Sequence, residues 1–235
     1  MRSPTTEFFR RIPVACWVPL ILAAGIAACS SNNSDTGGTP VHLTLVTGGS
    51  ITATVGTVIG PIEVLVTDAD TLPVQGVSVT FAATGGATLG VTTVATDAQG
   101  QALTTLTLPH NVGAVTVTAT AAGIATPISF QEIAMADVPA TMTGSGNNQS
   151  GPKGTLLSEP LGVSITDQFS NPVPGVTVTW ITTAGVLTLG SSRTDATGSA
   201  QTQLTLPGVA GPVMITGSAL IGSTTKTVNF TATAN

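Results

Sequence analysis

Six of the seven aspartates in this chain are candidates to act together as ligands of a metal ion. They are Asp68, Asp70, Asp97, Asp137, Asp167 and Asp195. Calcium takes about six to eight oxygen ligands, and carboxylates are common donors. However, the spacing fits neither an EF-hand loop nor a repeat-in-toxin loop, and Phe169 stands where a repeat of Asp70 would fall. We therefore expect turn capping, in which an aspartate accepts hydrogen bonds from nearby backbone N–H groups.

Two histidines could serve as catalytic bases or metal ligands. His42 lies near the start of a predicted strand, and His110 lies in the loop "LPHNVG". Neither recurs in the second half of the chain, where Thr141 and Gly208 stand instead. The sequence also lacks the nucleophile elbow GxSxG, the zinc motif HExxH and a glycine-rich phosphate loop. These observations predict a protein that is not an enzyme and that holds neither a metal nor a cofactor.

The composition favours β-sheet. Charged residues make up 7% of the chain, against about 25% in an average soluble domain. Threonine accounts for 43 residues, and valine, isoleucine and threonine all suit a pleated, half-buried surface. After residue 28 only three basic residues face ten acidic ones, a net charge of −7. Nucleic acid is excluded as a partner, because its binding needs clustered lysine and arginine.

The N-terminus reads as a targeting segment. Three arginines precede the apolar run "IPVACWVPLILAAGIAA", which ends in "IAAC" and is followed by the polar run "SSNNSDTGG". This pattern resembles the lipobox of bacterial lipoproteins. Residues 29–39, which after Cys29 are only serine, asparagine, aspartate, threonine and glycine, are predicted to form a flexible tether. The resemblance implies that residues 1–28 are a cleaved signal peptide and that Cys29 carries lipid. It also implies anchoring in a membrane, with Ser30 after the cysteine favouring the outer membrane. An ordinary secretory signal with a free Cys29 is the alternative.

The rest of the chain contains an internal repeat, in which several motifs recur in the same order. "VTDADTLPVQGVSVTF" at 66–81 returns as "ITDQFSNPVPGVTVTW" at 165–180, with eight of sixteen positions identical. "TDAQGQALTTLTL" at 96–108 answers "TDATGSAQTQLTL" at 194–206, and "GAVTVTATA" at 113–121 answers "GPVMITGSA" at 211–219. Two copies of one structural unit are therefore predicted, at 40–136 and 137–235. We call them the first and the second repeat.

Each repeat reads as about seven short strands separated by turns rich in glycine, proline, asparagine and aspartate. Strict alternation predicts which side chains point inward: Ile62, Val64, Val66, Val77, Val79 and Phe81, matched by Leu161, Val163, Ile165, Val176, Val178 and Trp180. Phe130 and Phe230 are expected in the two cores. Asp97 and Asp195 are expected to open turns that end at Gly100 and Gly198. At Gly76 and Gly175 a Cβ is expected to be crowded.

The order of these motifs, found twice, resembles the bacterial Ig-like domain of group 1, the module repeated in the intimin and invasin adhesins. The resemblance covers nearly all of residues 40–235. It implies an all-β chain of two tandem Ig-like antiparallel β-sandwiches. It does not supply a binding site, because this chain has no match to the barrel anchor or to the lectin-like tip of those adhesins.

The expected function is that of a non-enzymatic, lipid-anchored envelope protein, which presents two Ig-like domains as a short stalk or interaction module, with cell adhesion as one role. The alternative is a module that binds a glycan or a protein and faces the periplasm. Cys29 is the one residue with an expected modification, and the binding residues are unknown. The expected location is the outer membrane of a bacterial cell envelope, with exposure at the cell surface left open.

Overall fold

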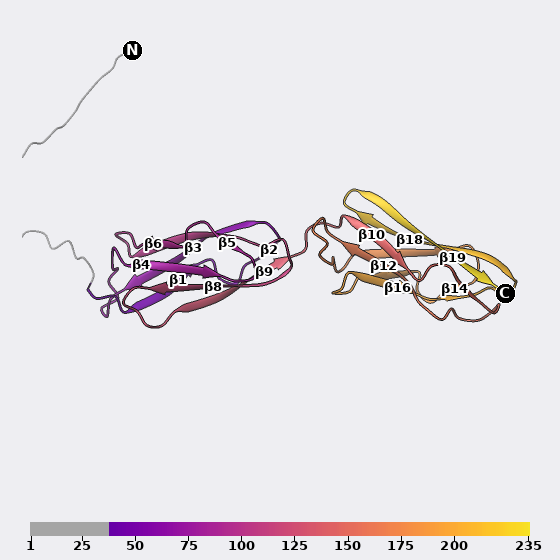
Figure 1. The fold of residues 1–235 in the computed structure, drawn as a ribbon, viewed down its shortest axis with the longest axis horizontal. Helices are drawn as coiled ribbons and strands as arrows, with labels where there is room; N and C mark the ends of the chain where they lie inside the picture. The colour runs from indigo at the N-terminus through magenta and orange to yellow at the C-terminus, as the bar shows by residue number, and fades with distance from the viewer. Residues whose placement is uncertain (1–37) are drawn as a thin grey trace, which may run out of the picture. The chain divides into compact units, whose positions relative to one another are not determined.

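The computed structural model describes residues 38–235, and its regular elements there are all β-strands (Figure 1). The predicted signal peptide, Cys29 and most of the predicted tether lie outside the described residues. Within residues 38–235 no helix is long and apolar enough to cross a membrane.

The first repeat forms two sheets around one core. Their strand orders are β1-β3-β7-β5 and β2-β9-β8-β4-β6. The strands are β1 (His42–Thr47), β2 (Thr52–Thr54), β3 (Val58–Thr67), β4 (Ser78–Ala83), β5 (Thr88–Leu89), β6 (Thr93–Ala95), β7 (Gln101–Thr107), β8 (Gly113–Ala121) and β9 (Ile128–Met135).

The second repeat follows the same plan. Its larger sheet runs β11-β19-β18-β13-β15, and the other side consists of β10-β12-β16 and the small pair β14-β17. The strands are β10 (Thr141–Ser145), β11 (Gln149–Gly151), β12 (Leu161–Thr166), β13 (Thr177–Thr182), β14 (Val186–Leu187), β15 (Ser191–Arg193), β16 (Ser199–Thr202), β17 (Leu204–Thr205), β18 (Gly211–Ile221) and β19 (Thr224–Ala234).

Each repeat contains one parallel strand pair among antiparallel ones. β2 runs parallel to β9, and β11 runs parallel to β19. Both pairs arise because the chain leaves its first strand, crosses to the opposite sheet within a few residues and joins that sheet at its edge. The predicted antiparallel sandwich is therefore confirmed, with one short parallel pair in each repeat that the alternation pattern did not predict.

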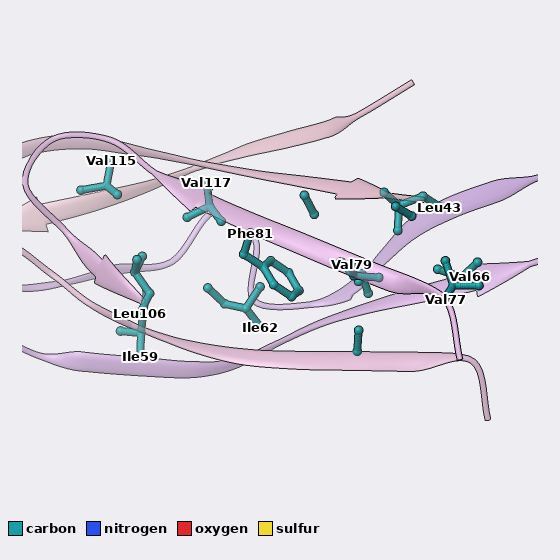
Figure 2. Packing of buried hydrophobic residues seen from close by; sticks show 14 of the residues in the cluster. Leu43, Ile59, Ile62, Val66, Val77, Val79, Phe81, Leu106, Val115 and Val117 are labelled. Atoms are coloured by element: carbon teal, nitrogen blue, oxygen red, sulfur yellow. The ribbon is translucent and has the colours of Figure 1, made fainter. Parts of the chain in front are cut away.

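The cores confirm most of the inward positions. Ile62, Val64 and Val66 have no exposed surface, and their counterparts in the second repeat are equally buried. Phe81 and Trp180 occupy corresponding places beside β8 and β18, as predicted, and Figure 2 shows Phe81 lying near Ile62 and Val79. Burial of each such side chain contributes about 1.5–3 kcal/mol.

Two expected core positions are only partly buried. Val176 and Phe130 are intermediate in exposure, whereas Phe230 is fully buried and packs on Trp180 at 5.9 Å between ring centroids. The prediction for Phe130 and Val176 is therefore wrong in degree. The indole Nε1 of Trp180 donates to Ser192 Oγ at 2.9 Å, so this buried ring also has its polar atom paired.

A buried threonine joins two turns in each repeat. The Thr96 hydroxyl donates to the Val74 carbonyl at 2.6 Å and accepts from the Val77 N–H at 2.9 Å. In the second repeat Thr194 makes the same two bonds, to Val173 and from Val176. The "TD" that begins both turn motifs is therefore a structural pair, in which the threonine binds inward and the aspartate caps the turn.

The turn glycines are needed for their backbone angles. Gly100 and Gly198 close the predicted turns with φ of +75° and +73°, and their N–H groups donate to the carbonyls of Asp97 and Asp195. Gly76 and Gly175 also have φ near +80°, but a Cβ there would meet nothing within 4 Å. The predicted crowding at Gly76 and Gly175 is wrong; the left-handed conformation is the physical reason for glycine.

Gly198→Val should destabilise the second repeat by about 2 kcal/mol or more. The new side chain would adopt a strained φ, and its Cβ would lie 2.5 Å from the Ile165 carbonyl oxygen. Thermal unfolding of residues 38–235 followed by the fluorescence of Trp180, the one tryptophan in that range, reports this change. Gly190→Val is the control, because a Cβ there meets nothing within 4 Å. Equal melting temperatures for the two variants would contradict the turn assignment.

Candidate functional site

In each repeat one aspartate caps the turn that follows the third strand, which is β3 in the first repeat and β12 in the second. In the first repeat, Asp68 Oδ1 accepts the N–H groups of Asp70 at 3.0 Å and Leu72 at 2.9 Å, and Oδ2 accepts that of Gly38 at 2.9 Å. In the second repeat, Asp167 Oδ1 accepts the N–H groups of Phe169 and Asn171, both at 2.8 Å. The other Asp167 oxygen accepts the N–H of Asp137 at 3.0 Å. Each carboxylate therefore connects the segment that leads into its repeat, at Gly38 or at Asp137, to the turn by hydrogen bonds.

Asp97 and Asp195 cap the later turns as predicted. Asp97 Oδ1 accepts the N–H groups of Gln99 and Gln101, each at 2.9 Å. Asp195 Oδ1 accepts the N–H and the hydroxyl of Thr197 at 2.8 and 2.6 Å, and the N–H of Ser199 at 3.1 Å. Each of these carboxylates satisfies backbone donors that would otherwise be left without a partner at the turn.

Hydrogen bonding stabilises the ionised form of three of these carboxylates. The N–H groups of Gly38 and Leu72 hold the pKa of Asp68 below its ordinary value, and the Thr197 hydroxyl and backbone N–H groups do so for Asp195. At Asp167 burial acts to raise the pKa, but the Asn171 amide and three backbone N–H groups outweigh it, so the pKa is lowered. The three side chains are therefore anionic turn caps.

The aspartates do not come together as a calcium centre would require. Across residues 38–235, no three histidine, cysteine, aspartate or glutamate side chains lie close enough to hold a metal ion. Asp137 bonds instead to the Val138 N–H at 2.7 Å and to the Gln168 amide at 2.8 Å. The geometry of these oxygens supports capping.

The histidines are placed apart from one another, and neither side chain hydrogen bonds within the described range. His42 is exposed on β1. The His110 ring stacks on Phe169, with 4.2 Å between ring centroids and 18° between the planes. This arrangement gives His110 a packing role across the repeat boundary and provides no carboxylate or hydroxyl partner for acid–base chemistry.

The side chain of Asn171 forms hydrogen bonds across the repeat boundary, a role that sequence reasoning missed. It is 5% exposed; its amide nitrogen donates to the His110 carbonyl at 2.7 Å and to Asp167 at 2.8 Å, and its Oδ1 accepts the Val112 N–H at 3.1 Å. The corresponding residue in the first repeat is Leu72, and Phe169 corresponds to Asp70. These two unlike exchanges within the repeated sixteen residues were the signal that could have revealed this role.

Asn171→Leu, which installs the residue of the first repeat, should free the amide of Val112. That amide should exchange with solvent several-fold faster, since this hydrogen bond is partly buried and a typical intramolecular hydrogen bond contributes about 0.5–1.5 kcal/mol. Hydrogen exchange by NMR measures this rate. The reciprocal Leu72→Asn is the control, because Leu72 is exposed and lies on a different turn. Unchanged exchange at Val112 in Asn171→Leu would show that the asparagine does not hold this segment.

Comparison with known proteins matches both repeats. The family model described as "Bacterial Ig-like domain (group 1)" covers residues 50–133 and 158–233. No curated protein matches the chain. Among solved structures, Yersinia pseudotuberculosis InvD is 19% identical with a TM-score of 0.58, covering 82% of this chain and 57% of InvD. The Escherichia coli adhesin FdeC is 17% identical with a TM-score of 0.47, covering 81% of this chain and 63% of that structure.

At these identities the likeness to solved structures concerns the fold. The family match is stronger evidence, because it spans more than half of the chain and falls on the two repeats separately. The matched ranges contain the paired motifs, the inward-facing strands and the capped turns described above. The chain therefore belongs to the family of bacterial Ig-like domains, group 1, and contains two copies of that domain.

Proposed function

We propose that this protein is a non-enzymatic, lipid-anchored component of a bacterial cell envelope, which presents its two Ig-like domains as a short stalk and interaction module. The observation that carries this proposal is how the acidic side chains are used. The carboxylates of Asp68, Asp97, Asp167 and Asp195 bind the backbone of their own turns, so these side chains serve the fold. Membership in the family of bacterial Ig-like domains, group 1, whose motif order resembles that of the intimin and invasin adhesins, supports the same function.

Anchoring through Cys29 fits the charge of the chain. With three basic residues against ten acidic ones after residue 28, the protein has no cationic surface to draw it to anionic lipids. Two or more acyl chains on one cysteine hold a protein firmly at a membrane, whereas a single chain is marginal. The outer membrane is the proposed location, and adhesion to another cell or surface is the proposed role.

The second candidate is a binding module that faces the periplasm, and two observations bear on it. Trp180 is 3% exposed, so it does not provide a stacking platform for a sugar. Ile181 and Met214 are 63% and 52% exposed on the outer face of the neighbouring strands β13 and β18, where the first repeat has Ala82 and Thr116. These apolar side chains favour a protein partner over a glycan.

Cys29→Ser should release the protein from the membrane. In the native host, the wild-type chain should enter the detergent phase on Triton X-114 partition and incorporate labelled fatty acid. The variant should lose both properties, because no lipid can be attached. Cys16→Ser is the matched control, since it removes the other cysteine of the chain from the predicted signal peptide. Membrane retention of Cys29→Ser would contradict lipid anchoring.

Protease treatment of intact cells, with an antibody against residues 140–235, separates the two candidate functions. Digestion of the second repeat while a periplasmic protein stays protected is the result expected for an adhesive stalk. Protection until the outer membrane is opened would reject that role and leave the periplasmic binding module.

A further inference from the structure

Glu132 is a charged residue placed in the core of the first repeat. It lies on β9, where the alternation that turns Ala134 inward also turns Glu132 inward, and its side chain has no exposed surface. Its cross-strand neighbour on β8 is Val115, itself 1% exposed. A fully buried glutamate without a charge partner is rare in proteins.

One carboxylate oxygen of Glu132 holds the crossing between the two sheets. Oε2 accepts a hydrogen bond from the N–H of Ile51, in the segment that carries the chain from β1 to β2. Next to it, the Ser50 N–H donates to the Gln131 carbonyl at 3.1 Å, and the Ser50 backbone has a φ of +62°. Oε1 is also buried but has no hydrogen-bond partner within the described residues.

The second repeat fixes the same crossing with a neutral group. Ala232 stands opposite Gln149 on the paired strands, at the places that Glu132 and Ile51 hold in the first repeat. The Gln149 amide nitrogen donates to the Gly146 carbonyl at 2.7 Å and to the Glu159 carbonyl at 3.0 Å. Its oxygen accepts the Glu159 N–H at 3.1 Å. The two repeats therefore share the crossing but differ in whether its anchor can take up a proton.

Within the described part of the first repeat, no lysine or arginine side chain is available to compensate an ionised Glu132. Residues 38–136 contain neither lysine nor arginine. The strands β1, β3, β7 and β8 turn Leu45, Ile62, Leu106 and Val115 toward the interior, and none of these can titrate.

The other titratable residues of the first repeat lie elsewhere. They are His42 on the exposed side of β1, Glu63 on the face of β3 opposite to Ile62 and Val64, and Asp68, Asp70, Asp97 and His110 in turns and loops. Burial raises the pKa of Glu132, and the N–H groups of Ile51 and Ser50 lower it by less.

We propose that Glu132 is a proton-operated latch: in its protonated form it holds the β1–β2 crossing and the edge strand β2 onto β9, and in its ionised form it loosens that corner of the first repeat. The proton is taken from or returned to solvent, and no other group changes. The second repeat has no such latch at its own crossing.

The sign of the pH dependence follows from the direction of the shift. Because folding favours the protonated form, the stabilisation is fully present below the ordinary pKa of 4.5 and is lost as the pH rises through the higher pKa of the folded protein. The aspartate caps behave in the opposite way, since their lowered pKa values cost stability only in acid. The crossing of the first repeat should therefore be held more tightly at mildly acidic pH than at neutral pH.

Hydrogen exchange on the whole chain, read by mass spectrometry, tests the latch. After correction for intrinsic exchange, protection of residues 48–55 should fall between about pH 4 and about pH 7, by about tenfold for each unit of upward pKa shift. Residues 146–152 of the second repeat should show no such fall. Glu132→Gln should abolish the pH dependence, whereas Glu63→Gln, the same change on the outer face of β3, should preserve it.

An infrared titration keeps the proposal testable if Glu132→Gln fails to fold. The wild-type protein should show the carbonyl band of a protonated carboxyl that persists above the ordinary pKa of glutamate. Titration of every carboxyl at or below its ordinary value would overturn the proposal. Equal pH dependence at the two crossings, or a pH dependence that survives in a folded Glu132→Gln, would overturn it as well.

Discussion

The fold depends on finding acceptors for backbone N–H groups where the chain turns or changes sheet. Strand ladders satisfy these groups within the sheets, but the turns after β3 and β12 and the crossings after β1 and β10 have no ladder. An unpaired buried N–H costs about as much as a lost hydrogen bond with its desolvation. Asp68 and Asp167 each accept two N–H groups of one turn, and Asp97 and Asp195 do so at the next.

This constraint explains how a chain with 7% charged residues uses its carboxylates. Threonine hydroxyls donate and accept hydrogen bonds at buried positions without introducing a charge, as Thr96 and Thr194 do between two turns. The apolar side chains that alternate along the strands then have only to fill the space between the two sheets. The result is a unit that can be repeated with many substitutions, provided that the acceptors at the turns are kept.

Much of this could be predicted from the sequence, because period-two alternation and turn chemistry are local. Ile62, Val64 and Val66 were identified by alternation, and Asp97 by its distance from Gly100. Asn171 was not, because its partners in the first repeat, His110 and Val112, are about sixty residues away in the sequence. Glu132 was not either: alternation places it inward with Ala134, but the expected exposure of a charged residue opposes that placement.

The parallel pairing of β2 with β9 could not be predicted from the sequence either. Three residues with no apolar alternation carry too little pattern to show which strand they join. The functional conclusion has the same limit, since a fold does not by itself determine a function and the repeated motifs contain no residue that identifies a partner.

The central claim is that Asp68, Asp97, Asp167 and Asp195 are structural caps, each with an oxygen that accepts backbone N–H groups of its own turn. Differential scanning calorimetry of residues 38–235, with added calcium and with EDTA, tests this claim most directly. The account predicts superimposable unfolding curves, because no three histidine, cysteine, aspartate or glutamate side chains of residues 38–235 lie close enough together to hold an ion. A melting temperature raised by calcium and lowered by EDTA would contradict it and make these turns a metal site.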